Sequence, residues 1–282
     1  MTKNEIKALI SLLDDYDYEV AAHVEQKIVS MGESVIPFLE EQWEETLDTE
    51  LQKKIEDLIH SLQYDALHQK LIAWKEAGAK DLLEGMWLVN TYQYPDVEFS
   101  TITKAIDQMY FEIWAQMQDD MHPYDQVKAL NNEMFKVKKF SANTKNFHSP
   151  ANSMLHLALE IKRGNPLTLC VIYMTIAQRL GFPIYGVNLP NLFILTYKLD
   201  GVQFYINVYN KGLILSKSDI DNYILQLNLN PIDIFYEPCS NLEIIKRALR
   251  NLAFSFEKMD DPEKAAEVTR LLDALTDDAC NT

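Results

Sequence analysis

Apolar residues recur every three or four positions through the N-terminal half of the chain. Within residues 4–62 the pattern forms four stripes, which begin at Ile6, Val20, Val35 and Leu51. This spacing places apolar side chains on one face of a helix. It therefore predicts four amphipathic helices, paired as two helical hairpins.

These hairpins resemble HEAT-type repeats, which pair amphipathic helices of similar length. The tight turn of the first hairpin contains Asp14, Asp15 and Asp17, and aspartate favours turns and helix N-termini. Two hairpins bury little apolar surface by themselves, so we expect them to stack on the helices that follow. We assign residues 1–64 to a HEAT-like N-terminal region.

Residues 65–150 begin as further helices and end as a polar segment. A new apolar stripe starts at Leu67 and ends before Gly78, and Pro123 marks the start of a later helix. Residues 137–149 are polar and irregular, and we interpret them as a solvated connector.

The period of apolar positions changes to two residues after Pro183, which indicates strands. Asp200-Gly201 is a dipeptide typical of a hairpin turn. We predict strands at residues 184–187, 192–197, 202–209 and 213–215. Together with the helices, this small antiparallel sheet predicts an α+β fold that is mostly helical.

The remaining pattern is helical again. Residues 216–225 predict one helix, and residues 241–274 predict a helical hairpin whose second helix begins at Pro262. This hairpin resembles a single tetratricopeptide-like unit. We divide the chain after residue 64 into a domain at 65–240, with a helical lead-in at 65–150 and a core at 151–240, and a hairpin at 241–282.

Charge and hydropathy limit the classes of partner. The chain has 282 residues and a formal net charge of −16, and such a chain repels phosphate backbones and anionic membranes. We therefore expect no nucleic-acid and no membrane partner. The most apolar run, residues 167–177, is shorter than the roughly 20 residues that span a bilayer. The N-terminus lacks the features of a signal peptide.

Cysteine and histidine usage indicates a cytoplasmic protein without a metal. Cys170, Cys239 and Cys280 include no pair at metal-site or redox-motif spacing, and three free thiols suit a reducing compartment. The six histidines show no ligand spacing with cysteines or acids. No glycine-rich phosphate loop is present, so we predict no metal and no cofactor.

Residues 160–185 organise the rest of the chain. A charged helix end leads into a turn at residues 163–166, and a very apolar helix follows and ends at Gly181. In many folds a turn that leads into a buried helix carries a nucleophile, because the helix N-terminus stabilises a thiolate.

Four segments around this junction resemble the SirB-type family of bacterial transglutaminase-like proteins. They are Asn152-Ser153 and residues 163–169, 179–183 and 186–190. The resemblance covers residues 80–275 and implies a transglutaminase-like core, related to the papain-like fold, with a tetratricopeptide-like hairpin. In enzymes with such cores a cysteine opens the buried helix, a histidine on the next strand takes its proton, and an aspartate or asparagine orients the histidine.

The resemblance places Pro166, Leu192 and Asn207 at these three catalytic positions. Proline has no nucleophilic side chain, and leucine cannot carry a proton. Asn207 can orient a histidine, but none stands at position 192. Because nucleophile and base are both missing, the acyl-transfer mechanism has no step left. The resemblance thus implies a non-catalytic pseudoenzyme, which we interpret as a protein-interaction or scaffold module with another protein as its partner.

Two other functions stay open. A cysteine hydrolase or transamidase would use Cys170, one turn after Pro166, with a relocated histidine such as His156 or His148. Cys170 lies in an apolar run, however, where a thiol usually packs as a small buried hydrophobe. Alternatively, a small ligand binds in the degenerate cleft. The candidate cleft residues are Asn165, Cys170, Asn188 and Asn191, with Asn207 close by.

Overall fold

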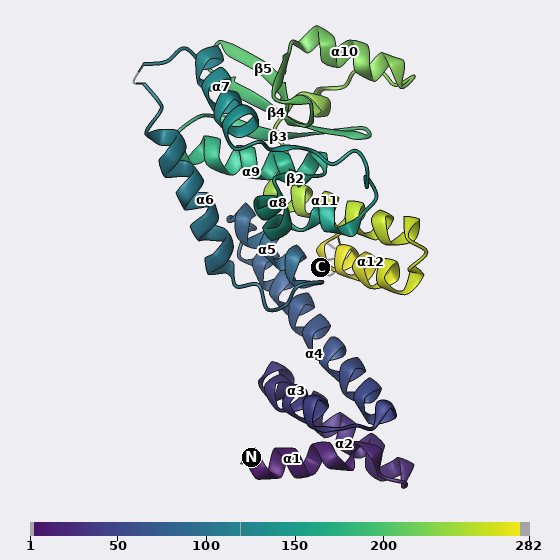
Figure 1. Ribbon diagram of the computed structural model, residues 1–282. Coiled ribbons are helices and arrows are strands. Elements are labelled where there is room, and N and C mark those ends of the chain that lie inside the picture. The colour runs from purple at the N-terminus through teal and green to yellow at the C-terminus, as the bar shows by residue number, and fades with distance from the viewer. Residues whose placement is uncertain (1–2, 119, 277–282) are drawn as a thin grey trace. The chain divides into compact units, whose positions relative to one another are not determined.

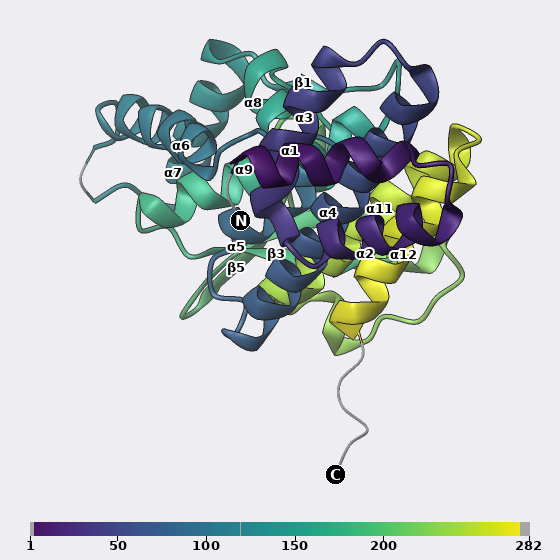
Figure 2. The same cartoon turned by 90° about the horizontal axis from the view of Figure 1, so that it is seen from below.

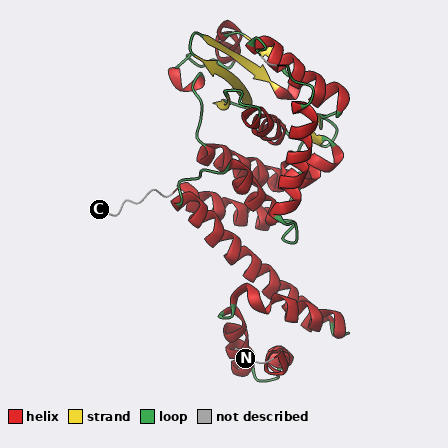
Figure 3. Ribbon diagram, turned by 90° about the vertical axis from the view of Figure 1, so that its left-hand side faces the viewer, coloured by secondary structure: helices red, strands yellow, loops and turns green. Residues whose placement is uncertain are grey.

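The computed structural model describes residues 3–118 and 120–276 (Figure 1). Its fold is α+β, mostly helical with a small antiparallel sheet, as the sequence predicts (Figure 3). The chain forms two compact units, and the first ends at Lys70 while the second begins at Leu71. Within the described residues, no helix combines the length and the hydropathy needed to cross a bilayer.

The first unit contains the predicted helices, α1 (Lys3–Ser11), α2 (Tyr18–Val29), α3 (Ile36–Glu45) and the start of α4 (Thr49–Glu76). Its core is made of aliphatic side chains from all four helices. The carboxylate of Asp17 caps α2 by accepting from the amide of Glu19 at 2.9 Å. The predicted stripes therefore do face a common interior.

Helix α4 runs without a break across the boundary that the sequence suggested between residues 64 and 65. No glycine or proline stands between Thr49 and Glu76. Without such a residue nothing interrupts the backbone hydrogen bonds, and two apolar stripes occupy one 28-residue helix.

The second unit is built around a buried helix that packs on a sheet. Its helices are α5 (Leu82–Thr91), α6 (Phe99–Trp114), α7 (Pro123–Asn131), α8 (Leu155–Ile161), α9 (Pro166–Arg179), α10 (Lys217–Gln226), α11 (Asn241–Lys258) and α12 (Pro262–Thr276). Helix α9 is the apolar helix of the sequence, and it packs on strands β3 and β4. Helices α11 and α12 form the predicted hairpin and lie side by side (Figure 2).

The sheet has the order β3-β4-β5-β6, with every neighbouring pair antiparallel. Its strands are β3 (Ile184–Leu189), β4 (Leu192–Leu199), β5 (Val202–Asn207) and β6 (Leu213–Leu215). Gly201 turns the chain between β4 and β5 with a φ of 77°, a conformation that glycine adopts without steric cost. The sequence extended β5 to residue 209, but a 3-10 turn at Val208–Asn210 ends the strand.

A short parallel pair links the polar connector to the start of α9. Strand β1 (Ser141–Ala142) pairs with β2 (Arg163–Gly164). The amide of Asn143 also donates to the carbonyl of Gly164 at 3.1 Å. The connector is therefore anchored beside the turn that precedes α9.

Candidate functional site

The N-terminus of α9 is fixed by Asn165. Its Oδ1 accepts from the amide of Thr168 at 2.8 Å, which makes Asn165 the N-cap, and its Nδ2 donates to Oγ of Ser153 at 3.0 Å. Pro166 follows in the first helical turn, where a missing N–H costs nothing. The turn at residues 163–166 is thus a well-satisfied helix start.

Asn152 holds the connector against this helix start. Its buried Nδ2 donates to the carbonyls of Asn146 at 2.6 Å and Phe147 at 3.0 Å, and its Oδ1 accepts from Nδ2 of Asn143 at 2.7 Å. Its own carbonyl accepts from the amide of Asn165 at 3.2 Å. The Asn152 side chain therefore holds Phe147 and His148 next to the start of α9.

Helix α11 supplies the facing wall. Arg247, Asn251 and Phe254 follow one another at spacings of four and three residues, so they share one face of the helix. A close approach to β3 positions this face. A Cβ on Gly186 would lie 2.7 Å from Cζ of Phe193 and 3.1 Å from Cδ1 of Ile244 on α11. The glycine therefore lets α11 lie close to the sheet.

Two adjoining hollows, which we call the α9–α11 cleft, lie against α11, and the smaller one also reaches the start of α9. The smaller, of about 100 Å³, includes Asn165, Pro166 and His148 in its lining. The wider, of about 660 Å³, includes Asn188 and Arg250. Five residues line both: Phe147, Asn191, Arg247, Asn251 and Phe254.

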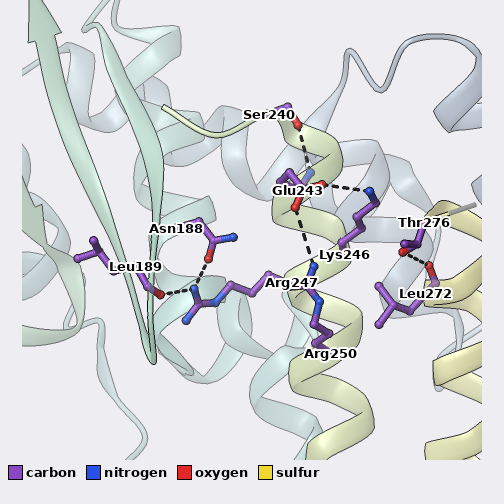
Figure 4. Close-up of polar contacts among 9 residues, drawn as sticks. All are labelled: Asn188, Leu189, Ser240, Glu243, Lys246, Arg247, Arg250, Leu272 and Thr276. Carbon is purple, nitrogen blue, oxygen red and sulfur yellow. Dashed lines mark hydrogen bonds and ion pairs between the residues drawn. The ribbon is translucent and has the colours of Figure 1, made fainter. Parts of the chain in front are cut away.

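Arg247 is the arginine that lines both hollows of the cleft. Its Nη1 donates to Oδ1 of Asn188 and, at 2.7 Å, to the carbonyl of Leu189 (Figure 4). The guanidinium also lies over the Phe193 ring, 5.7 Å from its centroid. Partial burial lowers the pKa of Arg247, and neighbouring Arg250 lowers it further. Among the described residues no carboxylate forms an ion pair with Arg247.

The other candidate cleft residues divide into two groups. Asn165, Pro166, Asn188 and Asn191 line one or both hollows. Leu192 pairs with Leu189 at the start of β4, and Asn207 accepts from the amide of Asn210 at 3.1 Å. Neither Leu192 nor Asn207 lines either hollow.

Cys170 lies one turn after Pro166 on α9 and lines neither hollow of the cleft. The side chain is fully buried, and Sγ is 3.7 Å from the carbonyl oxygen of Phe193. Burial strongly raises the pKa of the thiol because the thiolate would lose its hydration. The sequence expectation of a buried, apolar thiol is confirmed. Cys280 lies outside the described residues.

The two histidines near the core have different surroundings. Nδ1 of His156 is 2.6 Å from Oδ1 of Asn90, and burial lowers the pKa of its imidazole. His148 is exposed and lines the smaller hollow, with ring-centroid distances of 5.1 Å to Phe147 and 5.6 Å to Phe254. In the described part of the chain, no three histidine, cysteine or acidic side chains converge as metal ligands would.

Sequence reasoning missed Arg247, Asn251 and Phe254. We treated the segment that contains them only as part of the closing hairpin. An arginine and an asparagine one turn apart, beside the apolar stripe of α11, were the available signal. The partners of Arg247 on β3 lie 58 and 59 positions away in sequence, so the pattern alone could not place its side chain.

Comparison with known proteins identifies relatives of this domain. A family model described as the transglutaminase-like superfamily matches residues 100–250. A UPF0162 protein of Xylella fastidiosa (strain Temecula1) is 26% identical over 199 residues, which cover 66% of this chain and 68% of the relative. F-box only protein 21 of Homo sapiens is 29% identical over 106 residues, which cover 35% of this chain and 17% of the relative. No solved structure matches the chain.

Proposed function

We propose that this chain, which belongs to the transglutaminase-like superfamily, is a non-catalytic member of the SirB type and serves as a protein-interaction or scaffold module. The observation that carries the proposal is the helix start. Pro166 stands where the resemblance expects a nucleophile, and the thiol of α9, Cys170, is fully buried.

Acyl transfer needs a thiolate or alkoxide that can reach the substrate and a base within hydrogen-bond distance. The Sγ atom of Cys170 instead faces the carbonyl of Phe193, and burial disfavours its thiolate. The imidazole of His156 is engaged by Asn90. These contacts favour the pseudoenzyme over the alternative of a cysteine hydrolase that uses Cys170.

Site-resolved alkylation tests this part of the proposal. Native protein is treated with iodoacetamide and digested, and the peptide that contains Cys170 is followed by mass spectrometry. We expect no labelling of Cys170 until denaturant is added, because the thiol is both buried and protonated. Rapid native labelling of Cys170 would instead favour the hydrolase.

The HEAT-like helices of the first unit supply a surface for a protein partner. A hollow of about 470 Å³ in this unit is lined by Tyr16, Tyr18, Val29 and Asp57, among others. Tyr16 and Tyr18 are both highly exposed. Exposed tyrosines beside acidic residues favour a partner that presents apolar and basic groups, because tyrosine supplies large contact area with a polar end.

Affinity capture from the native cell, followed by mass spectrometry, tests the interaction proposal. We expect the double variant Tyr16→Ala/Tyr18→Ala to lose a partner that the unchanged chain retains. The matched control is Leu47→Ala, because Leu47 is 95% exposed on the same unit but lies outside the hollow. Equal recovery with all three chains would contradict this surface as the contact.

A second candidate function is ligand binding in the α9–α11 cleft. The uncompensated guanidinium of Arg247 at the junction of the two hollows favours it. This function does not exclude the first, since a binding cleft and a partner surface lie in different units.

A further inference from the structure

We propose that the α9–α11 cleft binds a carboxylate attached to an apolar group, with the guanidinium of Arg247 as its receptor. The inference rests on the second function above and adds the chemical class of the ligand. It is carried by the charge balance around Arg247 and by the aromatic and amide groups that surround it.

Arg247 has hydrogen-bonding capacity left over. Both of its hydrogen bonds leave from Nη1 and end on neutral oxygens of Asn188 and Leu189. Within residues 3–118 and 120–276, Nε and Nη2 of Arg247 donate no hydrogen bond. The other arginine of the cleft differs, since Nη2 of Arg250 lies 3.9 Å from a carboxylate oxygen of Glu243 (Figure 4).

The lack of a counterion on Arg247 is informative in this chain. The sequence has 42 acidic residues against 26 lysines and arginines, so carboxylates are abundant. Arg247 is partly buried, and its contacts with two neutral oxygens and the Phe193 ring do not neutralise its charge. An anion from outside would restore the balance, and both hollows give access to the guanidinium.

The available groups fit a carboxylate better than a phosphate. Two free nitrogens on one edge of a planar guanidinium match the two oxygens of a carboxylate. A phosphate carries more charge, and Arg250, the other cation in the described lining of the wider hollow, already has Glu243 nearby. The net charge of −16 adds a further penalty for a multivalent anion.

Aromatic rings provide a place for an apolar group. Phe147 and Phe254 line both hollows and are 47% and 46% exposed. His148 contacts both rings, so the three form one continuous wall. Apolar atoms placed against this wall would cover surface that is now in water, which is favourable.

Two amides complete the lining. The side chains of Asn191 and Asn251 make no hydrogen bond within the described residues, and both line both hollows. They can pair with the amide groups of a peptide. The ligand chemistry therefore suits either a small free acid or the C-terminal residue of a polypeptide, and the test separates the two.

The test is calorimetric titration of the full chain at low ionic strength with matched probes. The probes are acetyl-Ala-Ala-Phe with a free C-terminal carboxylate, the same peptide as its C-terminal amide, and acetyl-phenylalanine. We expect the free-acid peptide to bind at least about tenfold more tightly than the amide, because a charge-assisted pair is lost in the amide. This comparison uses the unchanged chain, so it does not depend on how variants fold.

Two variants then test whether Arg247 is the residue that binds the carboxylate. We expect Arg247→Gln to weaken the free-acid peptide by at least about tenfold and to leave the amide unchanged. Arg163→Gln is the matched control, because it removes one charge from an exposed residue that lines neither hollow. It should change the affinity less than about twofold.

Each outcome has a defined meaning. Equal affinity for acetyl-phenylalanine and the free-acid peptide identifies a small acid as the ligand, and a clear preference for the peptide identifies a chain terminus. If the amide binds as tightly as the acid, and Phe254→Ala abolishes both, the cleft binds ligands but the carboxylate inference is wrong. If no probe binds at millimolar concentration, both the inference and the ligand-binding function fail.

Discussion

The two helices that border the cleft present opposite kinds of surface. Helix α9 buries ten of its 14 residues and meets the cleft only through its N-terminal turn. Helix α11 buries its apolar stripe and turns Arg247, Asn251 and Phe254 toward the cleft. In enzymes with such cores the reactive group comes from the first helix. Here that helix contributes mainly packing, and the second helix contributes polar groups to the lining of the cleft.

The largest effect on stability should come from truncating a buried side chain of α9. We expect Ile172→Ala to lower the free energy of unfolding by about 2–5 kcal/mol, since Ile172 is fully buried and its loss leaves a cavity. Urea denaturation followed by circular dichroism measures the change. Leu225→Ala is the control, because Leu225 is 55% exposed and should shift the transition by less than about 0.5 kcal/mol.

A smaller loss of stability is expected when one asparagine of each helix is replaced in turn. Asn165→Ala removes the N-cap of α9 and the bond to Ser153, and should cost about 1–2 kcal/mol of stability. Asn251→Ala removes a side chain without a hydrogen bond in the described structure, and should change stability by less than about 0.5 kcal/mol. The same urea titration measures both, and equal losses would contradict the division of roles between α9 and α11.

The smallest expected effect is a dependence on pH. Burial lowers the pKa of His156 below its unfolded value, so the unfolded chain binds the proton more readily. Its contribution to stability is therefore complete above the unfolded pKa of about 6.5 and declines as pH falls toward the folded pKa. Melting temperatures of the unchanged chain and of His156→Gln should show this extra acid sensitivity only in the former. The same slope in both would exclude His156 as its source.

Local patterns predicted most of the secondary structure of this chain. The change of period after Pro183 predicted the sheet, because each strand alternates between its two faces. The end of β5 was placed two residues late. There, Asn207 caps a 3-10 turn and Lys211 adopts a φ of 54°, and apolar spacing carries no record of either feature.

The candidate site was less predictable than the fold. The start of α9 was visible in the sequence because a cap and a proline are local signals. The groups that face it were not visible. Arg247 contacts β3 where α11 packs close to the sheet at Gly186, and such a contact depends on the folded arrangement.

Asn152 affects how much conformational entropy the cleft would lose when it binds a ligand. Its amide clamps the backbone of Asn146 and Phe147 on one side, while its carbonyl holds Asn165 on the other. The Phe147 wall is therefore assembled before any ligand arrives, and swinging it away would break two hydrogen bonds at once. A preorganised wall of this kind loses little conformational entropy on binding. A ligand would therefore bind to a wall that is already ordered. In the Asn152→Ala variant the segment that contains Asn146 and Phe147 would have to become ordered when the ligand binds.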